Sequence, residues 1–318
     1  MKWYPLLFNP VYQEIIWGGR QLWRLMGREV PYERTAESWE LSSHPKGITT
    51  VANGPLQGKT LSELIRIDPV GFLGKDNPEA IFPLLVKIIG AQRDLSVQVH
   101  PDDEVGRKHG VPGKTEAWYI LSAAENSRII YGLKPGVNQE RLALALETGE
   151  LLSCVNEIPV QAGDFVPIPA GCVHALGAGI LVAELQQNSD TTYRLYDWGR
   201  TDAEGKPRPL HLQEGLEAIN CELPLPVSFK HSGEEGLLFD DEHFTISWRR
   251  VQGARQFKAG SSFSIWTVVE GNGLVAAGGQ EAPLVQGSSI LLPAGIGETT
   301  ATGEFSFLLT LPSIRSIN

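Results

Sequence analysis

The chain has 318 residues, enough for about two domains, and 42% of them are hydrophobic and 20% charged, as in an ordinary globular protein. Its net charge of -10 argues against a nucleic acid as the partner, because phosphate backbones are bound by basic surfaces. A small anion is not excluded by this charge, since a few local Lys and Arg residues can dominate a pocket.

The sequence contains no targeting or membrane-spanning pattern. Its apolar N-terminal run is interrupted by Pro5 and Pro10, and no stretch approaches the roughly 20 apolar residues of a membrane span. The cysteines Cys154, Cys172 and Cys221 have no CxxC spacing, which favours buried thiols over disulfides. We therefore expect a cytoplasmic protein without a membrane partner.

The predicted elements begin with a helix at residues 60–65, where Thr60 or Ser62 can cap the first turn. From residue 82 onward strands predominate. Apolar runs and alternating patterns predict them at 83–90, 95–101, 117–122, 164–169, 179–187, 243–251, 263–271, 289–295 and 305–312. Leucines at helical spacing predict one inserted helix at 138–154. Many short strands with turn signals favour a mainly β fold, a sandwich or barrel, over parallel βαβ units.

A strand–turn pattern occurs twice. Residues 163–174 read Gly, five residues, Pro-x-Gly, two residues and His174; residues 287–298 read the same and end on Glu298. Two copies more than a hundred residues apart predict two related β-barrels, with few helices alongside. We expect an N-terminal catalytic domain at 1–225 and a C-terminal barrel at 226–318 that lacks a metal site, because no HxH or QxH precedes Glu298.

Four residues are candidates for one metal site. Gln98 and His100 are two apart on a predicted strand and so share a face, Glu116 opens the next strand, and His174 closes the Pro-x-Gly turn. Imidazole and carboxylate groups suit Zn²⁺ and similar divalent ions, with an amide oxygen as a weaker fourth ligand. Each residue alone has an ordinary structural explanation; only the combination indicates a site. We interpret the histidines at 109, 211, 231 and 243 as surface or structural residues.

The ensemble resembles a cupin, and several segments resemble the type I mannose-6-phosphate isomerases closely. These are residues 83–104, 113–121, 15–19, 37–44, 169–177 and 189–200, so the resemblance runs from about residue 5 to 215 and continues loosely to the end. It implies two cupin-type, jelly-roll barrels. It also implies one zinc ion on Gln98, His100, Glu116 and His174.

The resemblance further implies a catalytic Arg194 and a substrate-facing Lys114. Only 58 positions separate Glu116 from His174, so the chain resembles the short bacterial or archaeal form, without the extra helical region of longer members. The implied substrate is a hexose phosphate, and the implied protein is a monomer or homodimer. Part of the phosphate site has no counterpart in the short form.

The implied reaction interconverts mannose 6-phosphate and fructose 6-phosphate through an enediol or enediolate. A divalent metal can stabilise the developing negative charge, while a base carries the proton. Glu37, Glu40 and a metal-bound water all stay open as the base, and Lys87 is a candidate substrate-binding residue along with the two glutamates. Arg194 has an alternative as a salt-bridge partner of Asp197 or Asp190; Lys114 and Lys87 have alternatives as solvated or ordinary strand residues.

Two other functions stay open. A metal-dependent cupin oxygenase would use similar ligands with redox-active iron. A non-catalytic sugar-binding cupin would share the fold and the ligands but not turnover. Residues 189–200, which carry Arg194, make the non-catalytic cupin the least favoured of the three functions.

Overall fold

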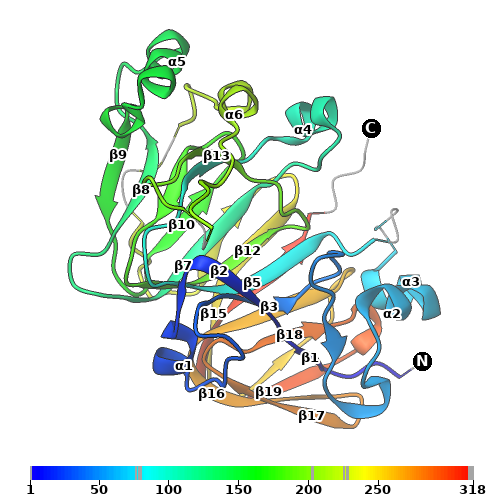
Figure 1. Cartoon of the computed structure of the whole chain (residues 1–318). Helices are drawn as coiled ribbons and strands as arrows, with labels where there is room; N and C mark the ends of the chain where they lie inside the picture. The colour runs from blue at the N-terminus through cyan, green and yellow to red at the C-terminus, as the bar shows by residue number, and fades with distance from the viewer. Residues whose placement is uncertain are drawn as a thin grey trace. The chain divides into compact units, whose positions relative to one another are not determined.

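The computed structural model describes residues 2–75, 77, 81–201, 204–224, 226 and 229–313 (Figure 1). The chain forms two compact units. The first unit comprises residues 1–12, 38–88 and 231–318, and the second comprises 13–37 and 89–230. This division differs from the consecutive domains expected at 1–225 and 226–318, which stay a prediction; residue 225 lies outside the described residues.

The first unit is built on one antiparallel sheet in the order β14-β15-β19-β16-β18-β1-β4, with β17 paired to β16. Its strands are β1 (Leu6–Asn9), β4 (Thr50–Val51), β14 (Gly236–Asp240), β15 (Phe244–Phe257), β16 (Ser264–Ala277), β17 (Gln280–Val285), β18 (Ser289–Leu292) and β19 (Thr299–Pro312). The long strands β15, β16 and β19 are drawn in yellow to red in Figure 1. Trp266 and Phe307 stack at 4.3 Å between ring centroids in its core. The apolar runs at 243–251, 263–271, 289–295 and 305–312 thus form strands because they bury one face of this sheet.

The helix predicted at 60–65 is confirmed as α2 (Leu61–Ile67). Thr60 accepts a hydrogen bond from the Glu63 amide at 3.2 Å, and the Glu63 carboxylate accepts one from the Thr60 amide at 2.8 Å. This reciprocal capping box satisfies two amides that a helix N-terminus leaves without partners. The other helical segments of this unit are α3 (Pro69–Leu73) and the 3₁₀ turns η1 (Gly54–Leu56) and η3 (Ala294–Ile296).

The second unit contains a five-stranded sheet in the order β13-β6-β11-β8-β9 and the strands β10-β7-β12 of another sheet. Their bounds are β6 (Val97–Val99), β7 (Glu116–Ala123), β8 (Arg128–Leu133), β9 (Val155–Pro159), β10 (Phe165–Ile168), β11 (His174–Leu176), β12 (Ile180–Gln187) and β13 (Tyr193–Tyr196). The sheet that contains β10, β7 and β12 continues with β5 (Leu84–Ala91), β3 (Thr35–Leu41) and β2 (Val11–Gly19). The division between the two units falls within each of these three strands. The fold is mainly β, as predicted, and β7 pairs antiparallel with both β10 and β12.

The helices of the second unit are α1 (Gln21–Met26), α4 (Asp103–His109), α5 (Gln139–Thr148) and α6 (Leu212–Ala218), with one 3₁₀ turn η2 (Leu151–Ser153). The single helix predicted at 138–154 is only partly correct. Asn138 caps α5 by accepting from the Arg141 amide at 3.0 Å, but the helix ends at Gly149, whose φ of 74° is left-handed. A left-handed glycine terminates a helix, so the chain turns before η2 begins. None of the described helices has the length and apolar character to cross a membrane.

The repeated strand–turn pattern has two different local structures. In the first copy β10 leads into a turn where Gly171 has φ 85°, and His174 then opens β11, fully buried. In the second copy β18 leads into η3, and Glu298 follows it as an exposed residue. The same residue spacing therefore brings a buried side chain to the strand start only in the first copy.

Candidate metal centre

Neighbouring strands bring the predicted ligands together. Gln98 on β6 lies directly opposite His174 at the start of β11, and directly opposed residues place their side chains on one face. Glu116 is the first residue of β7, and His100 follows β6 directly. The predicted set therefore comes from three strand ends of the second unit.

His100, Glu116 and His174 form a compact buried cluster, and their potential ligand atoms all lie within 4.8 Å of one another. Nε2 of His174 is 3.2 Å from Oε1 of Glu116, and Nε2 of His100 is 3.4 Å from Oε2. None of the three side chains is more than 1% exposed. A carboxylate and two imidazoles therefore converge in a space that is shielded from bulk solvent.

The histidine tautomers are fixed by backbone carbonyls. Nδ1 of His100 lies 2.7 Å from the Thr191 carbonyl, and Nδ1 of His174 lies 2.9 Å from the Cys172 carbonyl. A carbonyl oxygen only accepts, so each Nδ1 donates its proton and each Nε2 of a neutral ring presents a lone pair. This arrangement, in which the outer nitrogen is held by a hydrogen bond, is typical of metal-ligating histidines.

Burial and charge set the protonation of the cluster. Burial, and then the positive charge of Lys114, lower the pKa of His100 to about 3, although Glu116 opposes this. Burial raises the pKa of Glu116, but the charge of Lys114 and the neighbouring imidazoles of His100 and His174 outweigh it and hold that pKa well below its usual range. Glu116 is thus a carboxylate anion beside the neutral imidazole of His100.

The donor set fits a divalent cation. Neither carboxylate oxygen of Glu116 receives a hydrogen bond of normal geometry from any described residue, although both are buried and Oε2 forms an ion pair with Lys114. Two lone pairs directed at such an anion are unfavourable unless a cation lies between them. Two imidazole nitrogens and a carboxylate are a common ligand set for Zn²⁺ and its divalent neighbours, with a position left for water or substrate.

Gln98 adjoins this cluster with its nitrogen rather than its oxygen. Its Nε2 is 3.3 Å from Nε2 of His174, while its Oε1 accepts from Ser96 at 3.2 Å. Because an amide binds metals through oxygen, the Gln98 side chain would have to turn over to act as a ligand. Gln98 as the fourth ligand stays a prediction.

Lys114 lies in direct contact with the cluster. Its Nζ is 2.6 Å from Oε2 of Glu116 and 3.2 Å from Nε2 of His100, and the residue is only 4% exposed. It does not have the solvated position that was its alternative. The buried ammonium compensates the charge of Glu116 on the side that it faces.

Arg194 lies in the same row of side chains. It is directly opposite Gln98 in the pair of β13 and β6, and its Nη1 donates to the Pro209 carbonyl at 2.9 Å. Its Nε is buried and has no acceptor among the described residues. Burial and the neighbouring Arg208 lower the pKa of Arg194, yet an arginine stays charged at neutral pH.

The salt bridge suggested between Arg194 and Asp197 is not formed. Asp197 instead pairs with Arg200 and, through Nη2 at 2.5 Å and Nε at 2.8 Å, with Arg208. Asp197 is therefore already paired with Arg200 and Arg208, and Arg194 is not its partner.

The predicted substrate-binding residues belong to β3 and β5. Lys87 is 5% exposed and lies 5.2 Å above the ring of Trp39, and Glu40 accepts from Ser38 at 2.5 Å; both belong to the first unit. Glu37 is half-buried and belongs to the second unit. Their roles toward a substrate stay predictions.

Two buried polar residues on β12 escaped the sequence analysis. Glu184 accepts from the Trp118 indole at 2.7 Å, and the Trp118 ring meets that of His174 edge-on at 5.5 Å. Gln186 is fully buried and lies opposite Glu116. The signal for both is the spacing of two polar residues on one face of the strand predicted at 179–187.

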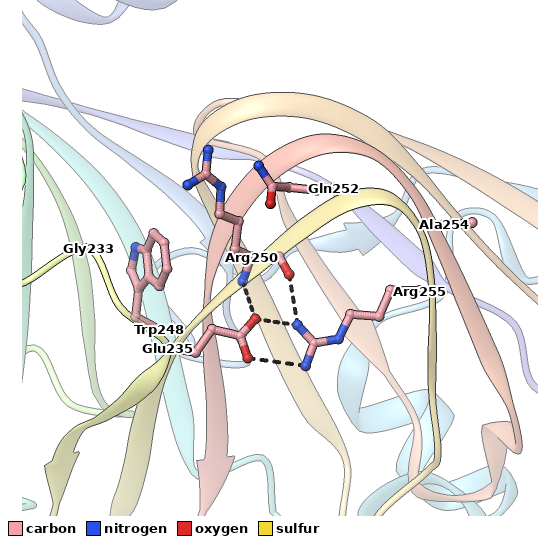
Figure 2. A pocket seen from close by; sticks show the side chains of 7 residues that line it. All are labelled: Gly233, Glu235, Trp248, Arg250, Gln252, Ala254 and Arg255. Atoms are coloured by element: carbon pink, nitrogen blue, oxygen red, sulfur yellow. Dashed lines mark hydrogen bonds and ion pairs between the residues drawn. The ribbon is translucent and has the colours of Figure 1, made fainter.

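The first unit has a separate pocket of about 370 Å³, shown in Figure 2. Glu235 and Arg255 form an ion pair there, with 3.2 Å between Oε2 and Nη2, and the Arg250 amide donates to Glu235 at 3.0 Å. None of its described lining residues is a histidine or cysteine. The pocket therefore offers no ligand set comparable with that of the second unit.

Comparison with known proteins places these features in a family. Residues 6–127 match the catalytic domain of type I phosphomannose isomerase, and residues 236–312 match the cupin domain of mannose-6-phosphate isomerase. The chain is 41% identical to the mannose-6-phosphate isomerase ManA of Bacillus subtilis, covering 94% of this chain and 96% of that protein. It is 34% identical to the mannose-6-phosphate isomerase of Streptococcus mutans, covering 96% and 97%.

Solved structures agree with this assignment. A crystal structure of the mannose 6-phosphate isomerase from Bacillus subtilis superimposes with a TM-score of 0.84 at 35% identity, covering 97% of this chain and 99% of that one. A zinc-bound mannose 6-phosphate isomerase has the same fold, with a TM-score of 0.78 at 18% identity over 97% and 99% of the two chains. The chain belongs to the type I mannose-6-phosphate isomerases, a family of cupin enzymes.

Proposed function

We propose that this protein interconverts mannose 6-phosphate and fructose 6-phosphate, using one divalent metal ion, zinc, on His100, Glu116 and His174. The observation that carries the proposal is the buried carboxylate of Glu116 between two imidazole lone pairs. The activity named for relatives at 34–41% identity supports the substrate, and the zinc reported in a structure of the same fold supports the metal.

An aldose–ketose isomerisation moves a proton between two adjacent carbons, and its difficulty is the negative charge of the enediolate. A bound divalent cation would polarise the carbonyl and stabilise that charge. The chain's own residues then divide the remaining tasks: Thr191 and Cys172 hold the imidazoles through their carbonyls, and Lys114 keeps Glu116 ionised. The burial of the cluster shields it from bulk solvent, which strengthens each of these interactions.

Arg194 is the residue we assign to the anionic part of the substrate. It lies in the same row as Gln98 and His174, and its buried Nε has no acceptor within the described part of the chain. A planar guanidinium suits a phosphate or a developing oxyanion, which it binds with two parallel hydrogen bonds.

The proton-transferring base is one of several groups. Glu37, Glu40 and a metal-bound water are the candidates from the sequence, and Glu184 adds a buried carboxylate within the second unit. Replacing each glutamate by glutamine would separate them. The base should lose turnover while the variant keeps its metal.

The direct experiment is an isomerase assay on the purified protein. Mannose 6-phosphate should be converted to fructose 6-phosphate, chelation should abolish conversion, and added zinc should restore it. Metal-replete protein that turns over no hexose phosphate would refute the proposal. Activity with zinc in the absence of oxygen would exclude an oxygenase.

A further inference from the structure

Gln186 is the last fully buried residue of β12 and the only described polar residue that lies directly opposite Glu116 on that strand. Directly opposed residues share a face, so its side chain points to the side of the strand on which Glu116 stands. Its Nε2 donates to the Gln187 carbonyl at 2.7 Å and to the Ser189 carbonyl at 2.5 Å. Both amide protons of the side chain are therefore committed to the segment that follows.

That segment carries a hydrogen bond of the metal centre. The Ser189 amide donates to the Gln187 carbonyl at 2.7 Å, and the Thr191 amide donates to Oγ of Ser189 at 3.3 Å. The Thr191 carbonyl in turn accepts from Nδ1 of His100 at 2.7 Å. The path from Gln186 to His100 thus runs through consecutive hydrogen bonds of 2.5, 3.3 and 2.7 Å.

We infer that Gln186 is a positioning residue of the metal centre. By tying the carbonyls of Gln187 and Ser189 to one side chain, it fixes residues 187–191 so that the Thr191 carbonyl accepts the His100 proton. His100 then keeps the tautomer whose Nε2 is directed at Glu116. The inference rests on the proposed function in that it assumes His100 to be a ligand.

The chemistry of the position supports a specific role for the amide. Oε1 of Gln186 is buried and has no donor among the described residues, which is an unfavourable state for a carbonyl. Its neighbours Val182, Ala183 and Leu185 on β12 are apolar and fully buried. An apolar residue at 186 would avoid the unsatisfied oxygen, but it could not bind the two carbonyls. The orientation of the amide is set by those carbonyls, because turning it over would direct its oxygen at them.

The side chain of Gln187 holds the same segment from another side. Its Oε1 accepts from the Thr115 amide at 2.7 Å, and its Nε2 donates to Asp103 at 3.3 Å. These bonds fix the start of the segment but do not reach Ser189. Of the side chains of Gln186 and Gln187, only that of Gln186 binds both Gln187, at the start of the segment, and Ser189, two positions before Thr191.

The test compares the zinc affinity of the wild type with that of Gln186→Met, which keeps the length of the side chain and lacks both donors. Competition against a chromophoric chelator should show zinc binding weakened about 10–100-fold, the range seen when residues that orient metal ligands are changed. The absorption spectrum of the cobalt-loaded variant should change as well, because the His100 ring is no longer fixed. Gln186→Asn, whose amide is one methylene shorter, should lose affinity too and serves if Gln186→Met does not fold.

A matched control is Thr267→Val, which removes a buried side-chain hydrogen bond to Ser289 in the first unit. It should lower the melting temperature without changing zinc affinity or the cobalt spectrum. A folded Gln186 variant with wild-type affinity and spectrum would overturn the inference. Failure of the wild type itself to bind zinc would instead overturn the proposed function, so the two outcomes are distinguishable.

Discussion

Arg194 lies directly opposite Gln98, and Gln98 lies directly opposite His174, so the three side chains form one row across the face of the five-stranded sheet. The register of β13, β6 and β11 therefore places Arg194 on the sheet face that carries Gln98 and His174. This row joins a residue that can bind an anion to residues that can bind a cation.

Arg194→Ala should lower kcat/KM for mannose 6-phosphate by about 10²–10³-fold, the usual loss when one group that stabilises developing charge is removed. The metal content of the variant, measured by elemental analysis, should equal that of the wild type, because Arg194 contacts none of the three clustered ligands. Arg107→Ala, an exposed arginine on α4, is the control and should keep full activity. Loss of metal from Arg194→Ala would show that the residue holds the site rather than the substrate.

Lys114→Met should destabilise the metal-free protein by about 3–5 kcal/mol in urea unfolding, because Glu116 would be left as a buried charge without its cation. With zinc present the loss should be smaller, since the metal then compensates Glu116. Lys108→Met breaks an exposed pair with Glu104 and should change stability little in either condition. A loss from Lys114→Met that is identical with and without zinc would contradict a metal on Glu116.

The arginine pair on Asp197 makes stability depend on pH. Burial raises the pKa of Asp197, but hydrogen bonds from Arg208 and Arg200 outweigh it and lower that pKa below its ordinary value. A carboxyl whose pKa is lowered by folding stabilises the fold above the unfolded pKa of about 3.9, and loses this contribution as pH falls through the folded pKa.

Asp197→Asn should therefore cost about 3 kcal/mol near pH 7, where the wild-type carboxylate is ionised and paired. The difference between the two proteins should shrink below pH 4, as the wild type becomes protonated. Urea unfolding at several pH values measures both. If the difference in free energy of unfolding between the two proteins stays constant down to the lowest pH measured, the charge of Asp197 contributes nothing to stability.

Gly171→Ala should impair the turn that leads to His174. Gly171 has φ 85°, which costs an L-residue about 1–2 kcal/mol, and a Cβ there would lie 3.0 Å from Cβ of Asn220. Gly163→Ala is the matched control, since it has φ 92° but open space around its Cβ. Both should lower the melting temperature, but only Gly171→Ala should also weaken zinc binding.

The sequence predicted the cluster because each member belongs to a short pattern of neighbouring residues. The period-two spacing of Gln98 and His100, the strand start at Glu116 and the Pro-x-Gly turn before His174 can each be recognised within ten residues. The groups that position the imidazoles belong to no such pattern. The Thr191 carbonyl holds the His100 imidazole from 91 positions away and the Cys172 carbonyl holds that of His174, and a backbone oxygen has no signature in a sequence.

Long-range pairing explains what else could not be predicted. β1 pairs with β18, and β4 pairs with β1, so the first residues of the chain join a sheet formed almost three hundred positions later. Gln186 and Glu184 were missed because the apolar character of β12 outweighed two polar residues on one face. The second strand–turn copy shows the reverse case, in which a matching pattern forms a 3₁₀ turn and leaves Glu298 exposed.

The central claim is that His100, Glu116 and His174 bind the metal on which isomerisation depends. Titrating zinc into one metal-free preparation, with activity and bound zinc measured on the same samples, tests it directly. Activity should rise in proportion to bound zinc and saturate at about one ion per chain, the number of ions that a single three-ligand cluster holds. His174→Ala should neither bind that ion nor gain activity. Turnover of mannose 6-phosphate by metal-free protein, or by His174→Ala at the wild-type rate, would contradict the claim.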